Sequence, residues 1–328
     1  MKILLTGGAG YIGSHTAWEA IDSGIEVVIL DNLSTGICEN CPPKAKFYEG
    51  SVGDAALLDQ IFSKEDFDAI IHFAGSIVVP ESVENPVLYY QNNVSNSIVL
   101  IDTCVRHNVK DFIFSSTAAV YGAPESDTVY EDTPTSPINP YGWSKLMIEQ
   151  VLRDVSAAHD LNVGILRYFN VAGGDPKGRT GQSTPDATHL IKVAAQHAVG
   201  LCDQIYIFGE DYPTPDGTCI RDYIHVTDLA RAHLSVLSAI EKRGESLTLN
   251  CGIGDGFSVK EVLETVEKAA GKKLNIISAP KRAGDPPCLV SNAERLREVT
   301  DWEPQYADLE EMARTAIMWE EILAKKNH

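Results

Sequence analysis

Short apolar runs alternate with longer mixed segments through the first half of the chain. The runs cover Lys2–Thr6, Glu26–Leu30, Ala69–Phe73, Asp111–Ser115 and Val163–Arg167. Each is followed by a segment with room for a helix. Strands that alternate with helices indicate βαβ units, so the pattern predicts an α/β fold with a doubly wound parallel sheet.

Beyond residue 170 the pattern changes to segments broken by glycine and proline, including 175–185 and 209–217. Residues 222–226 are then expected to open another amphipathic helix. No internal repeat or low-complexity linker separates the two regions. We therefore expect a second, smaller α/β part that is interleaved with the first rather than tethered to it.

A glycine-rich turn joins the first predicted strand to the helix expected at 14–23. Gly7, Gly10 and Gly13, and equally Gly8, Gly10 and Gly13, match spacings that dinucleotide-binding turns use. Glycine lets the backbone approach a pyrophosphate, whose charge then lies at the helix N-terminus. The second strand leads to Asp31, which would bind an adenosine ribose and repel a 2′-phosphate. These features predict NAD rather than NADP.

Tyr141 and Lys145 form a Tyr-x-x-x-Lys pair, and Thr117 follows the fourth apolar run. Residues four apart share one helix face, so the phenol and the ammonium are neighbours. A phenol titrates near ~10 and needs a shift of about three units, roughly 4 kcal/mol, to act as a base near pH 7. The nicotinamide ring of an oxidised dinucleotide would add a second cation. An isolated Tyr-x-x-x-Lys pair is most simply explained by a tyrosine and a solvated lysine on an exposed helix. The glycine turn in the same chain favours hydride-transfer chemistry instead.

Composition is typical of a well-packed globular protein with enough residues for two domains. Of 328 residues, 44% are hydrophobic, and 27 basic against 46 acidic residues give a net charge of −19. The dispersed acids disfavour a nucleic-acid partner. No apolar run approaches the ~20 residues that cross a membrane, and the glycine turn begins at Gly7, so we expect no membrane association and a cytoplasmic protein. Seven scattered cysteines are expected to be reduced, and no metal site is predicted.

Over essentially its full length the chain resembles the extended short-chain dehydrogenases/reductases and, among them, the UDP-glucose 4-epimerases. The similarity is carried by residues 7–15, 31–34, 114–122, 167–170 and, most discriminating, 211–226. We expect a Rossmann-like NAD-binding domain from 1–170 and 222–252, and a UDP-sugar-binding domain from 171–221 and 253–328. The resemblance also implies a homodimer formed by the helix near Asn85 and the helix of Tyr141.

The resemblance implies a redox-neutral inversion at C4 of a UDP-hexose through a 4-keto intermediate. Tightly held NAD would take a hydride from C4 and return it to the other face, while Tyr141 takes the hydroxyl proton. Thr117 would bond the reacting oxygen, and Lys145 would hold the nicotinamide ribose. Further NAD contacts would come from Gly7, Gly10, Tyr11, Ile12, Gly13, Asp31, Asn32, Leu33, Ser34, Thr35, Ser51, Val52, Phe73, Ala74, Gly75, Ile77, Asn92, Ser115 and Phe169. The UDP-sugar would contact Asn170, His189, Leu190, Tyr206, Phe208, Arg221, Arg282, Asp285 and Leu289.

Four of these positions depart from well-known members of the family, and one of them, Thr117, stands where some members have serine and so keeps the hydroxyl. Ser51 stands where an aspartate commonly holds the adenine amine, and Ile77 replaces a lysine seen near the ribose. Leu289 lies where the sugar pocket has a tyrosine in glucose-restricted members and a smaller residue in those that admit N-acetylated sugars. Its intermediate size leaves the turnover of N-acetylhexosamines open.

Related activities are alternatives. Ala118 and Ala119 follow Thr117 where nucleotide-sugar 4,6-dehydratases carry an acid/base pair, and neither can move a proton, which disfavours dehydration. A 4-epimerase of UDP-N-acetylglucosamine, UDP-glucuronate or UDP-xylose would use the same redox residues. A non-catalytic NAD-binding regulator is disfavoured because Thr117, Tyr141 and Lys145 occur together.

Overall fold

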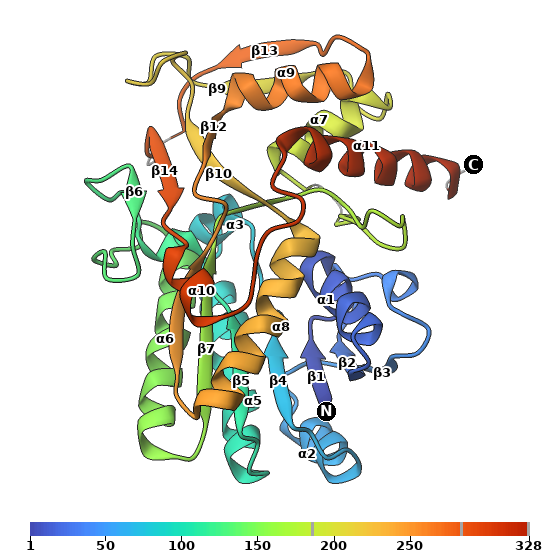
Figure 1. Ribbon diagram of the computed structural model, residues 1–328, viewed down its shortest axis with the longest axis vertical. Helices are drawn as coiled ribbons and strands as arrows, with labels where there is room; N and C mark the ends of the chain where they lie inside the picture. The colour runs from blue at the N-terminus through green and yellow to red at the C-terminus, as the bar shows by residue number, and fades with distance from the viewer. Residues whose placement is uncertain (185–186, 283–284, 327–328) are drawn as a thin grey trace.

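A large parallel sheet dominates the computed structural model of the chain, which describes residues 1–184, 187–282 and 285–326 (Figure 1). The order of its seven strands is β11-β7-β5-β4-β1-β2-β3, and every neighbouring pair is parallel. The strand order reverses between β1 and β4, which confirms the predicted doubly wound α/β fold. The strands are β1 (Lys2–Thr6), β2 (Glu26–Asp31), β3 (Lys46–Glu49), β4 (Ala69–His72), β5 (Asp111–Ser115), β7 (Asn162–Tyr168) and β11 (Leu247–Cys251).

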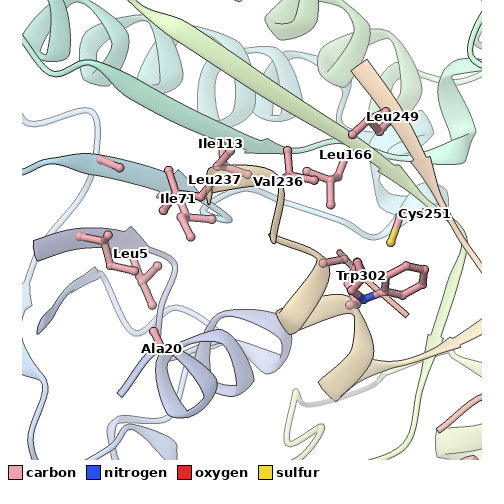
Figure 2. Packing of buried hydrophobic residues seen from close by; sticks show 14 of the residues in the cluster. Leu5, Ala20, Ile71, Ile113, Leu166, Val236, Leu237, Leu249, Cys251 and Trp302 are labelled. Carbon is pink, nitrogen blue, oxygen red and sulfur yellow. The ribbon is translucent and has the colours of Figure 1, made fainter. Parts of the chain in front are cut away.

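Alternate side chains of the sheet build two cores, one on each face. Ile3 and Leu5 of β1 belong to a cluster with α1 (Tyr11–Asp22) and α8 (Val226–Arg243). Figure 2 shows Leu5, Ile71 and Ile113 packed toward Val236 and Leu237 of α8. Leu4 instead faces the opposite core, formed with α2 (Ala55–Lys64), α5 (Asn96–Arg106) and α6 (Pro140–Ala158). Burial on both faces explains why these strands are apolar throughout.

A second group of elements lies beyond the carboxyl ends of β1 and β4 (Figure 1). Its main sheet has the order β12-β10-β14-β6, with β8 also paired to β10. These strands are β6 (Thr128–Val129), β8 (Asn170–Ala172), β10 (Ile220–His225), β12 (Gly256–Ser258) and β14 (Cys288–Ser291). A separate parallel pair joins β9 (Ile205–Phe208) to β13 (Ile276–Ala279). The helices here are α7 (Leu190–Ala198), α9 (Val259–Ala270) and α11 (Leu309–Lys326), whereas α10 (Glu294–Val299) packs beside β11 and places Leu296 in the core of the large sheet.

The helix expected to open at Asp222 begins later than predicted. Tyr223–His225 pair in parallel with Asn170–Ala172, so this segment continues β10. The His225 side chain then accepts a hydrogen bond from the Thr227 amide and caps α8, which starts at Val226. The expectation was wrong because the strand partner lies about fifty residues upstream. The chain thus leaves the large sheet after β7 and returns to it through α8 and β11.

The segment near Asn85, expected to start one helix, is divided into several short turns of helix. It comprises α3 (Val79–Glu84), α4 (Pro86–Tyr89) and a π-helical turn over Tyr90–Ser95 that leads into α5. Two 3₁₀ turns occupy Cys38–Asn40 and Ala118–Val120. Along the described ranges, no helix combines the length and apolar character that crossing a membrane requires.

Candidate active site

The predicted catalytic side chains meet where the carboxyl end of β5 faces the first turns of α6. Tyr141 lies in the first turn of α6 and Lys145 one turn later, and both are buried. The Lys145 ammonium donates to the carbonyl oxygen of Ser115 at 2.9 Å. The Thr117 hydroxyl is close enough to the phenol of Tyr141 to lower its pKa. We call Thr117, Tyr141 and Lys145 the Tyr141 cluster.

Burial dominates the electrostatics of the Tyr141 cluster. It raises the pKa of Tyr141, against a smaller lowering by the neighbouring Thr117 hydroxyl. Burial also lowers the pKa of Lys145 to about 8, while Glu149 acts in the opposite direction. Lys145 is therefore still mainly an ammonium at pH 7. Since the protein alone does not favour the phenolate, a further positive charge beside Tyr141 is needed to make it a base.

The glycine turn leaves the N-terminus of α1 without a side-chain cap at the carboxyl end of the central strand β1. Gly10 is the N-cap of α1 and offers no side chain to bond the first-turn amides. Gly7 has φ +69°, and a Cβ there would lie 2.6 Å from the Ala74 amide nitrogen. A Cβ on Gly13 would lie 2.2 Å from the Gly7 carbonyl oxygen. The turn is thus packed closely against its surroundings, and the first-turn amides of Tyr11 and Ile12 suit a phosphate.

Asp31, at the end of β2, organises the neighbouring loop. Its carboxylate accepts from the amides of Ala9 at 2.9 Å and Leu33 at 2.8 Å. Leu33 has φ +56°, and the Asn32 side chain accepts from the Ser34 amide at 3.1 Å. A carboxylate has about four acceptor sites, so Asp31 retains capacity for ribose hydroxyls. The arrangement fits the adenosine half of NAD.

The remaining predicted NAD residues line the ends of β3, β4 and β7. Ser51 accepts from the Gly53 amide at 3.1 Å, so its hydroxyl is engaged in a local turn beside buried Val52. Asn92 donates to Ser76 at 2.8 Å in the loop that contains Ala74 and Gly75. Ile77 on that loop is exposed, whereas Phe73 packs against His233.

Asn93 is a site residue that the sequence did not reveal. Its side-chain oxygen accepts from the Ser76 amide at 2.7 Å. Its amide group donates to the Ser76 carbonyl at 3.0 Å and to Ser144 at 2.9 Å. It therefore ties the loop after β4 to α6 next to Lys145. The only sequence signal is the pair Asn92-Asn93, which says nothing about contacts 51 residues away.

Part of the predicted UDP-sugar site lies on the second sheet. Asn170 begins β8, directly after Phe169, which belongs to a small buried cluster with partly buried Leu289 at its side. Leu289 on β14 is the direct neighbour of Arg221 on β10. The Arg221 guanidinium lies 3.8 Å from the carboxylate of Asp285. This sheet thus carries both a cation and the residue predicted to set sugar size.

The other predicted substrate residues lie on α7 and β9. His189 is the N-cap of α7, ahead of Leu190, and its Nδ1 lies 2.8 Å from the side-chain nitrogen of Gln182. Burial lowers the pKa of His189. On β9, Tyr206 is exposed and Phe208 carries the Arg282 guanidinium 3.8 Å from its ring centroid. Residues 283–284, between Arg282 and Asp285, lie outside the described ranges.

Comparisons with known proteins identify the family of the chain. The model of the NAD dependent epimerase/dehydratase family matches residues 3–252, and the chain belongs to this family. It is 54% identical over 322 residues to a UDP-glucose 4-epimerase of Azospirillum brasilense, covering 98% of this chain and 92% of that protein.

Two solved structures are similar over almost their full lengths. The UDP-glucose 4-epimerase of Bifidobacterium longum in complex with NAD⁺ and UDP has a TM-score of 0.92 and 37% identity, covering 98% of both chains. The UDP-Glc/GlcNAc 4-epimerase of Campylobacter jejuni has a TM-score of 0.86 and 50% identity, covering 98% of this chain and 99% of that one. The predicted family and fold are confirmed.

Proposed function

We propose that this protein is a UDP-glucose 4-epimerase, which inverts C4 of a UDP-hexose through a 4-keto intermediate with tightly bound NAD. The observation that carries the proposal is the buried Tyr141 cluster at the end of β5. It occurs in a chain that matches a UDP-glucose 4-epimerase over its whole length. Ala118 and Ala119 beside Thr117 offer no acid or base for elimination, which argues against a dehydratase.

The cofactor would be held by residues 1–170 and 222–252, and the sugar nucleotide by 171–221 and 253–328. The open end of α1 would bind the pyrophosphate and Asp31 the adenosine ribose. One N–H of the Lys145 ammonium is bonded to Ser115, so the other two can bind the nicotinamide ribose. When bound, NAD accepts a hydride from C4 of the sugar and returns it to the opposite face of the ketose.

The side chains of the Tyr141 cluster would manage the proton. The Tyr141 phenolate takes the proton of the 4-hydroxyl as the ketone forms and returns it when the alcohol is restored. Thr117 fixes the orientation of the phenol and of the reacting oxygen. Lys145 stabilises the phenolate by its charge. All three side chains are buried, which keeps water from the intermediate.

The diphosphate would lie between Arg221 on β10 and Arg282, which follows β13 and stacks on Phe208 of β9. Asn170, His189 and Leu190 would complete that site, with Tyr206 and Phe208 beside the uracil. The size of the Leu289 side chain would then determine which sugars fit the pocket.

The test is to mix purified protein with UDP-galactose, without added NAD, and to follow UDP-glucose by NMR. Conversion is expected, because both the hydride and the cofactor are retained through the cycle. No conversion, even with NAD supplied, would show that plain hexose epimerisation is wrong. The same assay on UDP-N-acetylglucosamine, UDP-glucuronate and UDP-xylose would then choose among the other UDP-sugar 4-epimerases.

UDP-N-acetylglucosamine is a second candidate substrate. The Campylobacter jejuni protein, which is 50% identical, is described as acting on UDP-Glc and GlcNAc forms. Leu289 is smaller than tyrosine and packs against the small buried cluster that contains Phe169. Replacing Leu289 by Tyr should reduce turnover of the N-acetylated sugar and keep that of UDP-galactose.

We also propose that the protein is a homodimer. Large apolar side chains are exposed on two sets of neighbouring helices, α3–α5 and α6. Val87 and Leu88 lie on α4, Ile98 on α5, and Trp143 and Met147 on the outer face of α6. Such a patch supports a helical interface between two copies.

A further inference from the structure

Three successive residues at the end of β5 contact three residues on one face of α6. Ser115 accepts from Lys145, Thr117 lies beside Tyr141, and Ser116 between them donates from its hydroxyl to Glu149 at 2.6 Å. Glu149 lies one turn beyond Lys145, and the side chains of Ser116 and Glu149 are both fully buried. Tyr141, Lys145 and Glu149 are spaced four residues apart, so they form one stripe along α6.

The Glu149 carboxylate is also bonded to two arginines. Arg167 on β7 donates to both of its oxygens, from Nε at 3.0 Å and from Nη2 at 2.6 Å. Arg153, one turn further along α6, donates to it at 2.8 Å. Tyr121 accepts from Arg167 at 3.0 Å. A buried ion pair contributes little net stability. Because Glu149 lies one helical turn from Lys145, we assign this ion pair a role in the site.

We propose that Glu149 is a positioning residue that fixes Ser116, and with it the Ser115–Thr117 turn, against α6, and whose negative charge keeps Lys145 an ammonium. This inference rests on the proposed function for the role of Lys145. Glu149 does not touch the reacting atoms. It acts through the two neighbours of Ser116 and through its charge one turn away from Lys145.

Glu149 is the anion nearest Lys145 along the stripe of α6, and Arg167 and Arg153, which are bonded to its far side, offset part of its charge. Tyr141 on the same helix, Tyr168 on β7 and Tyr89 on α4 all have raised pKa values because of burial, so they are neutral. Burial lowers the pKa of His72 on β4 to about 3, so it is neutral too. Glu149 is the group that opposes the effect of burial on the pKa of Lys145.

The test is Glu149→Gln, which keeps the shape and the acceptor oxygen but removes the charge. The Cε resonance of Lys145, in protein labelled with ¹³C-lysine, is titrated without any sugar present. We expect the midpoint to fall by about one pH unit, as for the loss of a nearby opposite charge. The basic limb of the pH profile for kcat should move by the same amount. An unchanged Lys145 midpoint would overturn the electrostatic part of the proposal.

Glu131→Gln is the matched control. Glu131 belongs to the outer part of the same network, where its carboxylate accepts from the Asn250 amide at 2.9 Å and its carbonyl oxygen from Arg167. It does not contact Ser116, so the Lys145 midpoint should stay in place. Because the titration needs no substrate, a wrong substrate assignment would leave this result intact.

Two further variants keep the inference testable if Glu149→Gln unfolds because Arg167 is left unpaired. The double variant Glu149→Gln, Arg167→Met removes both charges and should still lower the Lys145 midpoint. Ser116→Ala keeps the charge but removes the tie to the turn. We expect a fall in kcat of about tenfold with KM and the Lys145 midpoint unchanged; an unchanged kcat would overturn the positioning role.

Discussion

At the scale of single residues, Tyr141 is the proposed base, and Tyr141→Phe tests it. Loss of the hydroxyl should lower kcat by about 10²–10⁴-fold, because no other group in the Tyr141 cluster accepts a proton at neutral pH. NAD should remain bound, as measured by the cofactor released on denaturation. The exposed Tyr130 provides the control Tyr130→Phe, which should keep full activity. Full activity of Tyr141→Phe would mean that another group is the base.

The sequence predicted the residues of the site that depend on local spacing. Tyr141 and Lys145 share a helix, and their proximity follows from the period of that helix. Asn93 and Glu149 could not be found in this way, because their partners Ser144 and Ser116 lie 51 and 33 positions away along the chain. The direction of the pKa of Tyr141 also needed the structure, since burial cannot be read from a motif.

At the scale of elements, the glycine turn before α1 permits a specific test. Gly13→Ala would place a Cβ 2.2 Å from the Gly7 carbonyl oxygen, so the turn must shift. We expect a loss of bound NAD and of roughly 2 kcal/mol or more in stability, because backbone atoms cannot move aside cheaply. Equilibrium urea unfolding and the NAD content of the purified protein measure the two effects.

Gly24→Ala, just beyond the other end of α1, is the control for that experiment. Gly24 has φ +79°, and a Cβ added there would meet no atom within 4 Å, so the new methyl group enters open space. The substitution should cost about 1 kcal/mol from left-handed backbone strain and leave NAD binding unchanged. Equal NAD loss in both variants would show that the close approach at Gly13 is unimportant for the cofactor site.

The helices and strands that could be predicted are those whose residue pattern reflects their burial. The strands of the large sheet are buried on both faces, and their sequences are apolar runs. β6 and β8 have two and three residues, too few to show a pattern. β10 carries Asp222 and Arg221 between apolar positions and reads as a helix start until its pairing with β8 is known. The π-helical turn that aims Asn93 has no sequence signature.

At the scale of the whole molecule, buried histidines should make the fold sensitive to acid. Burial lowers the pKa of His15 and His233 to about 4, and that of His72 and His225 to about 3. These values lie below the unfolded value of about 6.5. The stability they contribute is therefore complete above pH 6.5 and is lost as the pH falls toward the folded values. At pH 5, each of these histidines should lower the free energy of unfolding by roughly 2 kcal/mol relative to its value above pH 6.5.

His233→Leu tests this prediction at one site. The Nδ1 of His233 donates to the Leu229 carbonyl oxygen at 2.8 Å, and its buried Nε2 has no partner among the described residues. Protonation would therefore leave a buried N–H without a hydrogen-bond partner. A leucine at this position has no group to protonate. The free energy of unfolding, measured in urea from pH 7.5 to 5, should fall less steeply for His233→Leu. The exposed His159 gives the control His159→Gln, whose slope should match that of the parent protein.

The proposed dimer is tested by placing a charge within the exposed apolar patch. Val87 on α4 is 66% exposed, and the adjacent α6 presents Trp143 and Met147 on the face opposite the Tyr141 cluster. Burying these side chains between two copies would stabilise the pair, whereas a carboxylate at Val87 would be desolvated without a partner. Sedimentation velocity should give a dimer for the parent protein and a monomer for Val87→Glu at micromolar concentration. Leu201→Glu, at a similarly exposed site beyond α7, should stay dimeric. A monomeric parent protein would overturn the dimer, and a dimeric Val87→Glu would place the interface elsewhere.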